Sequence, residues 1–423
     1  LQVAPWISLI LVLLLAAMDL YTPRRRVAVA IVNSVLVVVA AMSVVTMALS
    51  FWLRGFAFPR GVLVLGAVIH FVLLSAWRLL CWALDRRSHG LKTVMVVGSI
   101  DGGKDLLQKF IDAPPGWLEP SLFFLPEDLE VIAGNLSKVD AVLLAPSIPD
   151  ERKAQIAQLC YEAGCELFLV PSIYDMLVFR SRVGQIDDLP VLEARPVGLT
   201  REQQLVKRVL DLLVSGLLLP VIVLLGALIA VLIKVSSPGS VLYRQIRVGQ
   251  GGRKFYLYKF RTMIPNAERL TGPVLATADD PRITPLGRLL RATRLDELPQ
   301  FYNILRGEMS LVGPRPERPS FVKEFIASYP EYRFRFMVKP GVTGLAQVMG
   351  KYSTDVADKL RYDLFYISHY TLLLDLKIIL QTLLMLMQPG AAAGRSDQSE
   401  ETDALLNHLL GERETQVESS NMW

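Results

Sequence analysis

Cysteine and histidine are both scarce in this chain of 423 residues, which has three cysteines and four histidines. The cysteines at positions 81, 160 and 165 form neither an even set nor a metal-binding spacing, which argues against a disulfide framework. We therefore expect reduced thiols. The four histidines are too scattered to indicate a zinc site; they are His70, His89, His369 and His408.

Charged side chains are also few, at 20% of the residues, whereas 52% are hydrophobic and the mean hydropathy is +0.38. This composition is too apolar for an ordinary soluble protein, and the length fits two or three domains. Residues 243–349 nevertheless hold 18 Lys and Arg against 9 Asp and Glu, a net charge of +9 in a chain of +5. Such a local excess favours phosphate ligands or an anionic lipid surface. Nucleic acid is not an expected partner, because this basic segment follows a membrane segment and lacks a nucleic-acid-binding motif.

Three apolar stretches lie near the N-terminus, at about residues 5–20, 27–53 and 61–84. A helix that spans a bilayer needs about 20 apolar residues, a length that the second and third stretches reach and the first narrowly misses. Arginines at 24–26 and 86–87 follow the first and third stretches, and the positive-inside tendency places both groups in the cytoplasm. Three crossings would leave the N-terminus outside, and the initial Leu leaves open a further helix upstream.

A fourth apolar run, residues 209–233, contains Pro220. Proline removes a helical hydrogen bond and clashes with the preceding turn, so a kinked helix could enter one leaflet and return to the same face. A plain transmembrane helix with a tolerated proline is the other interpretation. Lys207-Arg208 and Lys234 flank the run on both sides, so charge gives no direction and these residues alone leave both interpretations open.

Residues 89–200 are soluble in character and predict a Rossmann-like α/β domain. Apolar, β-rich runs at 93–97, 141–145 and 166–170, with a helical stretch at 150–163, indicate strands alternating with helices in a parallel sheet. The turn Gly98-Ser-Ile-Asp-Gly-Gly103 could bind a nucleotide phosphate, but it does not match Gly-x-Gly-x-x-Gly and no ribose-binding acid follows. We therefore favour a structural or dimerising role, which leaves a homodimer open.

The segment after residue 234 predicts a β-hairpin. Two apolar runs flank the turn-prone Gly249-Gln-Gly-Gly252, and the second run ends near Lys259 and Arg261. Lys-Phe-Arg on its own is usually a solvated basic edge. Its place shortly before a pair of carboxylates indicates ligand binding.

Residues 280–287 lead into a helix on which Arg288, Arg291 and Arg294 recur at a spacing of three. They should lie broadly along one face. An amphipathic helix on anionic lipid explains this pattern, and so do arginines that reach diphosphate oxygens. Both explanations can hold for different arginines.

Two adjacent carboxylates, Asp296 and Glu297, come next, and residues 297–306 predict a helix with Pro299 in its first turn and Gly307 as its stop. Taken alone, Asp296 is most simply an N-cap. The same helix start offers free N–H groups and a positive dipole, which would keep Asp296 ionised and help to bind a phosphate. A carboxylate can act as a covalent nucleophile, and Glu297 could hold Mg²⁺ together with phosphate oxygens.

Two rigid loops follow: residues 313–316, which present Arg315, and residues 339–348; either could be structural alone. Asp363 lies in the tyrosine-rich run 362–366, and an apolar helix is expected at 375–387. The polar tail 389–423 is predicted to be disordered apart from a short helix at 404–410.

Together these motifs resemble the bacterial sugar transferases, the monotopic phosphoglycosyl transferases that start polysaccharide and glycoconjugate assembly. The resemblance covers residues 207–387 and rests on five motifs in order: 258–263, 280–287, 295–300, 309–316 and 339–345. The N-terminal part is similar to long-form members, which initiate exopolysaccharide, capsule or O-antigen synthesis with undecaprenyl phosphate.

The resemblance implies a ping-pong reaction. Asp296, at the position of the family's nucleophile, would attack the β-phosphorus of a UDP-sugar, UMP would leave, and undecaprenyl phosphate would accept the phosphosugar. Glu297 matches the metal-binding glutamate, which implies Mg²⁺. Four further residues fall in motifs that line the site: Lys259, Arg261, Arg315 and Asp363. A hexose is expected as the sugar, glucose or galactose.

The resemblance also implies that residues 209–233 form a re-entrant helix in contact with membrane lipids. The family often kinks this helix at Ser-Pro, whereas this chain has Leu219-Pro220. The expected fold is a membrane protein with transmembrane helices in 1–88, the α/β domain in 89–200 and a mainly α-helical monotopic catalytic domain in 201–388. That catalytic domain would lie on the cytoplasmic face of the bacterial inner membrane.

Two other functions stay open. A nucleotide-sugar dehydratase or epimerase built on residues 89–200 would need NAD, which the imperfect glycine turn disfavours. A non-catalytic assembly scaffold would depend on residues 1–200 and tolerate changes at Asp296.

Overall fold

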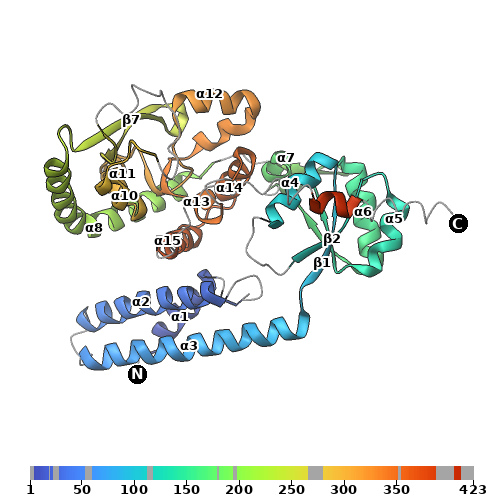
Figure 1. Cartoon of the computed structure of the whole chain (residues 1–423), viewed down its shortest axis with the longest axis horizontal. Coiled ribbons are helices and arrows are strands. Elements are labelled where there is room, and N and C mark those ends of the chain that lie inside the picture. The colour runs from blue at the N-terminus through green and yellow to red at the C-terminus, as the bar shows by residue number, and fades with distance from the viewer. Residues whose placement is uncertain are drawn as a thin grey trace. The chain divides into compact units, whose positions relative to one another are not determined.

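The computed structural model describes residues 4–18, 20–21, 28–52, 60–111, 118–178, 181–193, 198–264, 280–350, 354–386 and 404–410. The chain divides into two compact units (Figure 1). One comprises residues 1–172 with 396–423, and the other comprises residues 173–395.

The three N-terminal apolar stretches are helices, as predicted: α1 (Ala4–Ala17), α2 (Ala28–Trp52) and α3 (Arg60–His89). By length and composition, α2 and α3 can cross a membrane, and α1 is shorter. The arginines at 24–26 lie outside the described residues, so their predicted place in the cytoplasm stays a prediction.

The expected parallel sheet is present, in the order β2-β1-β3-β4. Its strands are β1 (Lys92–Val97), β2 (Leu118–Phe124), β3 (Ala141–Leu144) and β4 (Glu166–Leu169), and the sequence patterns missed β2. The helices are α4 (Ile100–Ile111), α5 (Leu129–Asn135), the short 3-10 helix η2 (Leu136–Lys138) and α6 (Asp150–Ala163).

Packing explains the glycine turn that precedes α4. A Cβ on Gly103 would come within 2.1 Å of the Phe123 ring, and a Cβ on Gly98 within 2.7 Å of Ala145. Both positions therefore need glycine for close packing of the sheet, whether or not a phosphate binds there. This observation gives no support to the dehydratase or epimerase alternative.

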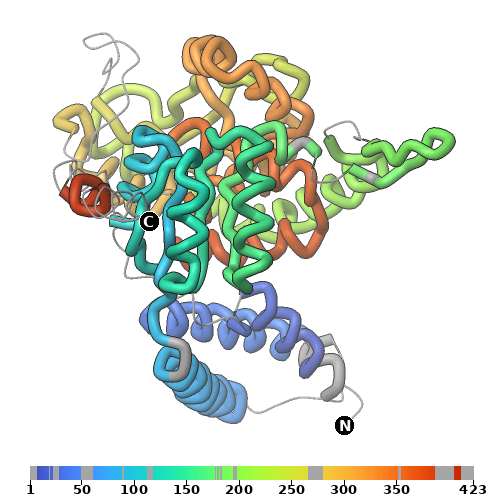
Figure 2. The backbone as a smooth tube through the Cα atoms, turned by 90° about the vertical axis from the view of Figure 1, so that its right-hand side faces the viewer, coloured from blue at the N-terminus to red at the C-terminus, as the bar shows by residue number. Residues whose placement is uncertain are grey.

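The predicted helix at residues 404–410 exists, and it is docked in a way that the sequence did not indicate. Leu406 and Leu409 are buried in the same hydrophobic core as the four strands. Figure 2 shows this red helix beside the α/β domain. The C-terminal segment therefore completes the core of the domain; the rest of the predicted tail lies outside the described residues.

The second unit is mainly helical, as predicted. It begins with α7 (Ile173–Val178), the hairpin of β5 (Arg182–Ile186) and β6 (Leu189–Glu193), and the long helix α8 (Arg201–Ser236). The hairpin that was predicted after residue 234 is confirmed: it consists of β7 (Leu242–Val248) and β8 (Lys254–Phe260), joined through η3 (Gln250–Gly252). Next come α10 (Pro285–Ala292), η4 (Leu295–Glu297), α11 (Gln300–Arg306), β9 (Ser310–Val312), α12 (Pro319–Ser328) and η5 (Pro330–Met337). The unit ends with β10 (Gly341–Thr343), which pairs with β9, and with α13 (Leu345–Met349), α14 (Val356–Ser368) and α15 (Leu372–Leu386).

Helix α8 begins at a capping box, in which Thr200 and Gln203 bond each other's backbone N–H groups. Its 36 residues include Pro220, and its two halves run in different directions in Figure 1. Lys207, Asp211 and Ser215 of the first half are buried, as are Ile229 and Ile233 of the second half. Leu217 and Leu224, on either side of the proline, are 79% and 77% exposed. The apolar middle of α8 is thus largely exposed among the described residues.

Candidate active site

The adjacent carboxylates Asp296 and Glu297 lie in η4, between α10 and α11. Arg294 enters this turn in the left-handed conformation, with φ at 55°, and the chain turns sharply there. The predicted helix start is corrected, because α11 begins at Gln300 and Pro299 precedes it. Asp296 is therefore not an N-cap. Within the part of the chain that the structure describes, burial and neighbouring charges, and no hydrogen bond, act on its carboxylate.

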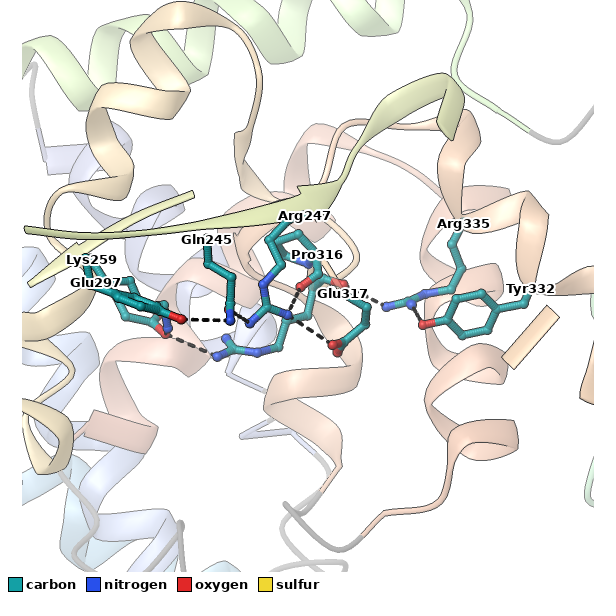
Figure 3. A network of polar contacts seen from close by, with 10 residues as sticks. Gln245, Arg247, Lys259, Glu297, Pro316, Glu317, Tyr332 and Arg335 are labelled. Atoms are coloured by element: carbon teal, nitrogen blue, oxygen red, sulfur yellow. Dashed lines mark hydrogen bonds and ion pairs between the residues drawn. The ribbon is translucent and has the colours of Figure 1, made fainter. Parts of the chain in front are cut away.

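Two cations hold Glu297. Lys259 Nζ lies 2.6 Å and an Arg315 guanidinium nitrogen 3.2 Å from the same oxygen, Glu297 Oε1. Lys259 comes from β8 and Arg315 from the loop after β9, so three distant segments meet at Glu297. Figure 3 shows Lys259 beside Glu297. The structure thus brings together three of the predicted site residues, with Asp296 adjacent.

The pKa values of the two carboxylates are shifted in opposite directions. Burial raises the pKa of Asp296 above its ordinary value, although Lys259 lowers it in part. Burial also acts on Glu297, but Lys259 and Arg315 outweigh it and hold the pKa of Glu297 well below its ordinary value. The expected stabilisation of the Asp296 carboxylate by a helix start is not found, because α11 begins only at Gln300. Neighbours with such divergent pKa values are suited to different chemical roles.

The three arginines before the site do not share one face. Helix α10 ends at Ala292, so Arg294 lies beyond it and its guanidinium is 3.9 Å from the Met385 sulfur. Arg288 is exposed. Arg291 donates to the Thr262 hydroxyl at 2.9 Å and lowers the pKa of Asp296 electrostatically. Arg291 therefore acts electrostatically on Asp296, and Arg294 helps to lower the pKa of Glu297.

Two other predicted residues are engaged elsewhere. Arg261 donates to the carbonyl oxygens of Ser237 and Pro238, at 2.9 and 3.0 Å, and so binds the end of α8. Asp363 is buried on α14, where it accepts from Arg335 at 2.7 Å. Neither side chain contacts Glu297. Their predicted contacts with substrate stay predictions.

Several residues that support the site were not predicted from the sequence. Asn303 of α11 is fully buried and bonds the backbone of β8 on both sides, accepting from Tyr258 N and donating to Tyr256 O. It thereby joins the helix after the carboxylates to the strand that carries Lys259. The only feature of the sequence that could have indicated this role of Asn303 is its position in the run that follows Asp296. Arg247 and Arg335 also support the site, and no local pattern marks them.

The carboxylate pair offers some of the ligands that a divalent metal ion needs. Glu297 Oε1 is taken by two cations, which leaves Oε2 and the unbonded Asp296 carboxylate as donors. The described residues contain no cluster of three or more potential metal ligands. Mg²⁺ usually takes one or two carboxylates together with phosphate oxygens and water, so these residues fit Mg²⁺ when a diphosphate is present.

Comparison with known proteins identifies the family of this chain. The family model "Bacterial sugar transferase" matches residues 202–389. The UDP-glucose:undecaprenyl-phosphate glucose-1-phosphate transferase of Klebsiella pneumoniae is 34% identical over 330 residues, 72% of this chain and 70% of the relative. The Escherichia coli K12 protein of the same name is 33% identical over 319 residues, 70% of this chain and 68% of the relative. A UDP-N-acetylgalactosamine-undecaprenyl-phosphate N-acetylgalactosaminephosphotransferase of Aeromonas hydrophila is 44% identical over 181 residues, 42% of this chain and 43% of the relative.

Proposed function

The chain belongs to the bacterial sugar transferase family, and from this premise we propose that it transfers a sugar-1-phosphate from a UDP-sugar to undecaprenyl phosphate. It is a phosphoglycosyl transferase, as the names of its relatives indicate. The observation that carries the proposal is the pair of buried carboxylates among Lys259, Arg291 and Arg315. A diphosphate needs these cations, and a covalent transfer needs a carboxylate that no other group occupies.

Asp296 is the nucleophile in this proposal. One of its carboxylate oxygens attacks the β-phosphorus, and the bond from that phosphorus to the bridging oxygen breaks. UMP leaves with the bridging oxygen, and the phosphosugar stays on Asp296. A phosphate oxygen of undecaprenyl phosphate then attacks the same phosphorus, the bond to Asp296 breaks, and undecaprenyl-diphospho-sugar is released. The lack of hydrogen bonds to Asp296 supports this role, because its charge is less stabilised and therefore more reactive.

The neighbouring cations neutralise the diphosphate. Lys259 and Arg315 already face the carboxylate pair and would contact phosphate oxygens with small movements. Glu297 would hold Mg²⁺ beside the diphosphate through Oε2, the oxygen that Lys259 and Arg315 leave free. Bound there, Mg²⁺ would supply charge neutralisation of the phosphate oxygens.

We propose that α8 is re-entrant, since both of its ends are bound to one compact body. In the first half, Arg208 donates to the carbonyl oxygens of Ile304 and Leu305 at 2.6 and 2.8 Å. At the other end, Arg261 of the segment after β8 binds the carbonyls of Ser237 and Pro238. Asn303 joins α11 to β8, so the two attachment points belong to the same structure.

A straight α8 of 36 residues would be about 54 Å long, enough to put its ends on opposite sides of a bilayer. Attachment of both ends to one body favours entry and exit on the same face. The exposed apolar middle of α8 would then contact lipid, and the site would meet the phosphate of the lipid acceptor at the interface. Because nucleotide sugars are cytosolic, we place this domain on the cytoplasmic face of the inner membrane.

The test is release of UMP from purified protein in detergent with Mg²⁺, undecaprenyl phosphate and a panel of UDP-sugars. UDP-glucose is the first donor, because two relatives that match 72% and 70% of this chain are named as glucose-1-phosphate transferases. Asp296→Asn should abolish release, whereas Glu324→Gln, at an exposed carboxylate of α12, should not change it. Failure of every UDP-sugar, or full activity of Asp296→Asn, would refute the proposal.

A further inference from the structure

The loop that carries Arg315 is held by hydrogen bonds to four successive carbonyl groups. Pro314 O accepts from Gly341 N at 3.0 Å, and Glu317 O accepts from Val248 N at 3.0 Å. The two carbonyls between them, of Arg315 and Pro316, accept from the side chains of two arginines, one buried and one mostly buried. Proline has no N–H, so this segment depends on its carbonyl groups for attachment.

The first of these arginines is Arg335 of η5. It donates to Arg315 O at 3.1 Å, to the Asp363 carboxylate at 2.7 Å and to the Tyr332 hydroxyl. The Arg335 side chain is 7% exposed and that of Asp363 is 2% exposed. A guanidinium that serves three acceptors in fixed directions is a geometry that lysine does not reproduce.

The second is Arg247 of β7, which approaches the next residue of the loop. It donates to Pro316 O at 2.9 Å, to Glu317 at 3.2 Å and to Gln245 Oε1 at 2.8 Å, as Figure 3 shows. Adjacent carbonyls are thus bound by arginines from two different elements. We call Arg247 and Arg335 the backbone clamp.

The side chain of Arg315 lacks comparable support. It is 41% exposed, and among the described residues its guanidinium bonds only Glu297. Its direction is therefore set mainly by the backbone that the clamp holds. Gly313 adds to this constraint, because a Cβ there would lie 2.4 Å from Lys339 O.

We propose that Arg247 and Arg335, with Asp363 as the counter-ion of Arg335, are positioning residues that aim Arg315 at the carboxylate pair. This inference rests on the proposed function, since it takes Arg315 to act on the diphosphate. It gives Asp363 a role without substrate contact: it keeps Arg335 charged and oriented inside the domain.

The kinetic test uses the double substitution Arg335→Met with Asp363→Leu, which removes the buried pair whole and leaves no lone charge. We expect kcat for UMP release to fall about 10- to 100-fold, as for other supporting residues, with a smaller change in KM. Arg333→Met is the matched control, because Arg333 is exposed two residues away. Addition of Arg315→Met to the double variant should cost little more than Arg315→Met alone.

A second measurement tests the clamp without relying on activity. Hydrogen–deuterium exchange of the peptide 311–318 should become faster in the double variant and in Arg247→Lys, but not in Arg333→Met or in the exposed Arg244→Met. Faster exchange with unchanged kcat would overturn the positioning role. Unchanged exchange, or kinetic effects that add to those of Arg315→Met, would overturn the clamp.

If the wild type released no UMP, the proposed function and the positioning role would both fail, while exchange would still decide the clamp. If the double variant does not fold, Arg247→Lys decides by the same two measurements.

Discussion

Lys259 and Glu297 form a 2.6 Å ion pair across 38 residues of sequence, with side chains 21% and 11% exposed. This contact brings the hairpin of β7 and β8 onto the turn that holds the carboxylates. It occupies one oxygen of Glu297 and none of Asp296. Glu297, which the ion pair binds, is therefore suited to electrostatic stabilisation. Asp296, which it leaves unbonded, is suited to nucleophilic attack.

The ion pair predicts the effect of changing Lys259. Lys259→Met leaves Glu297 with Arg315 alone and removes a cation from the diphosphate site. We expect UMP release to fall on the order of 100-fold, as for loss of one preorganised electrostatic group. Lys259→Arg should recover part of it. Lys254→Met, at the exposed start of the same strand, is the control and should keep wild-type activity. A Lys259→Met enzyme with normal rates would show that the lysine only stabilises the fold.

The raised pKa of Asp296 predicts a pH effect on rate. The attacking form is the carboxylate, so the rate of the first step should decline as the pH falls through the pKa of Asp296. Because burial raises that pKa, the decline should begin above the ordinary pKa of 3.8. Single-turnover UMP release across a pH series, without lipid acceptor, measures it. A rate that stays constant down to the ordinary pKa would contradict the raised pKa.

The same shift predicts an effect on stability. Since the folded-state pKa of Asp296 lies above the unfolded value, ionisation at neutral pH opposes folding, and this cost disappears below the unfolded pKa. Asp296→Asn should therefore raise Tm by roughly a few degrees at pH 7. The difference should shrink as the pH falls toward the ordinary pKa. Thermal melts of both proteins in one detergent test this, and a lower Tm for the variant at pH 7 would count against it.

The re-entrant path of α8 predicts labelling from one side only. Single cysteines at two exposed positions, Glu202→Cys and Ser240→Cys, flank the helix in a background without native cysteines. A membrane-impermeant maleimide should label both in inverted vesicles and neither in intact spheroplasts. Leu217→Cys, in the exposed apolar middle, should resist labelling in both. Labelling of the two flanking positions from opposite faces would establish a crossing helix instead.

Local signals in the sequence account for much of the fold. Apolar runs predicted the N-terminal helices, and the glycine turn at residues 249–252 predicted the hairpin that delivers Lys259. The carboxylate pair stood out by chemistry alone. Helix boundaries were less predictable, since the left-handed Arg294 delays α11 and removes Asp296 from the N-cap position.

Contacts between distant residues could not be predicted. Arg335 meets Asp363 across 28 residues, and Lys207 meets Asp375 across 168, and neither pair leaves a periodic trace in the sequence. The role of Arg261 at the end of α8 and the burial of Leu406 and Leu409 are further examples. Each depends on how elements pack after they form, which is information that spacing along the chain does not contain.

Covalent capture tests the central role of Asp296 most directly. The wild-type protein is mixed with UDP-glucose labelled with ³²P at the β-phosphorus, or with the UDP-sugar that the panel identifies, in the absence of lipid acceptor. It is quenched within one turnover, digested and analysed by mass spectrometry. We predict a phosphosugar on the peptide that contains Asp296, lost when undecaprenyl phosphate is added and absent in Asp296→Asn. Normal turnover to lipid product with no label on that peptide at any time point would contradict it.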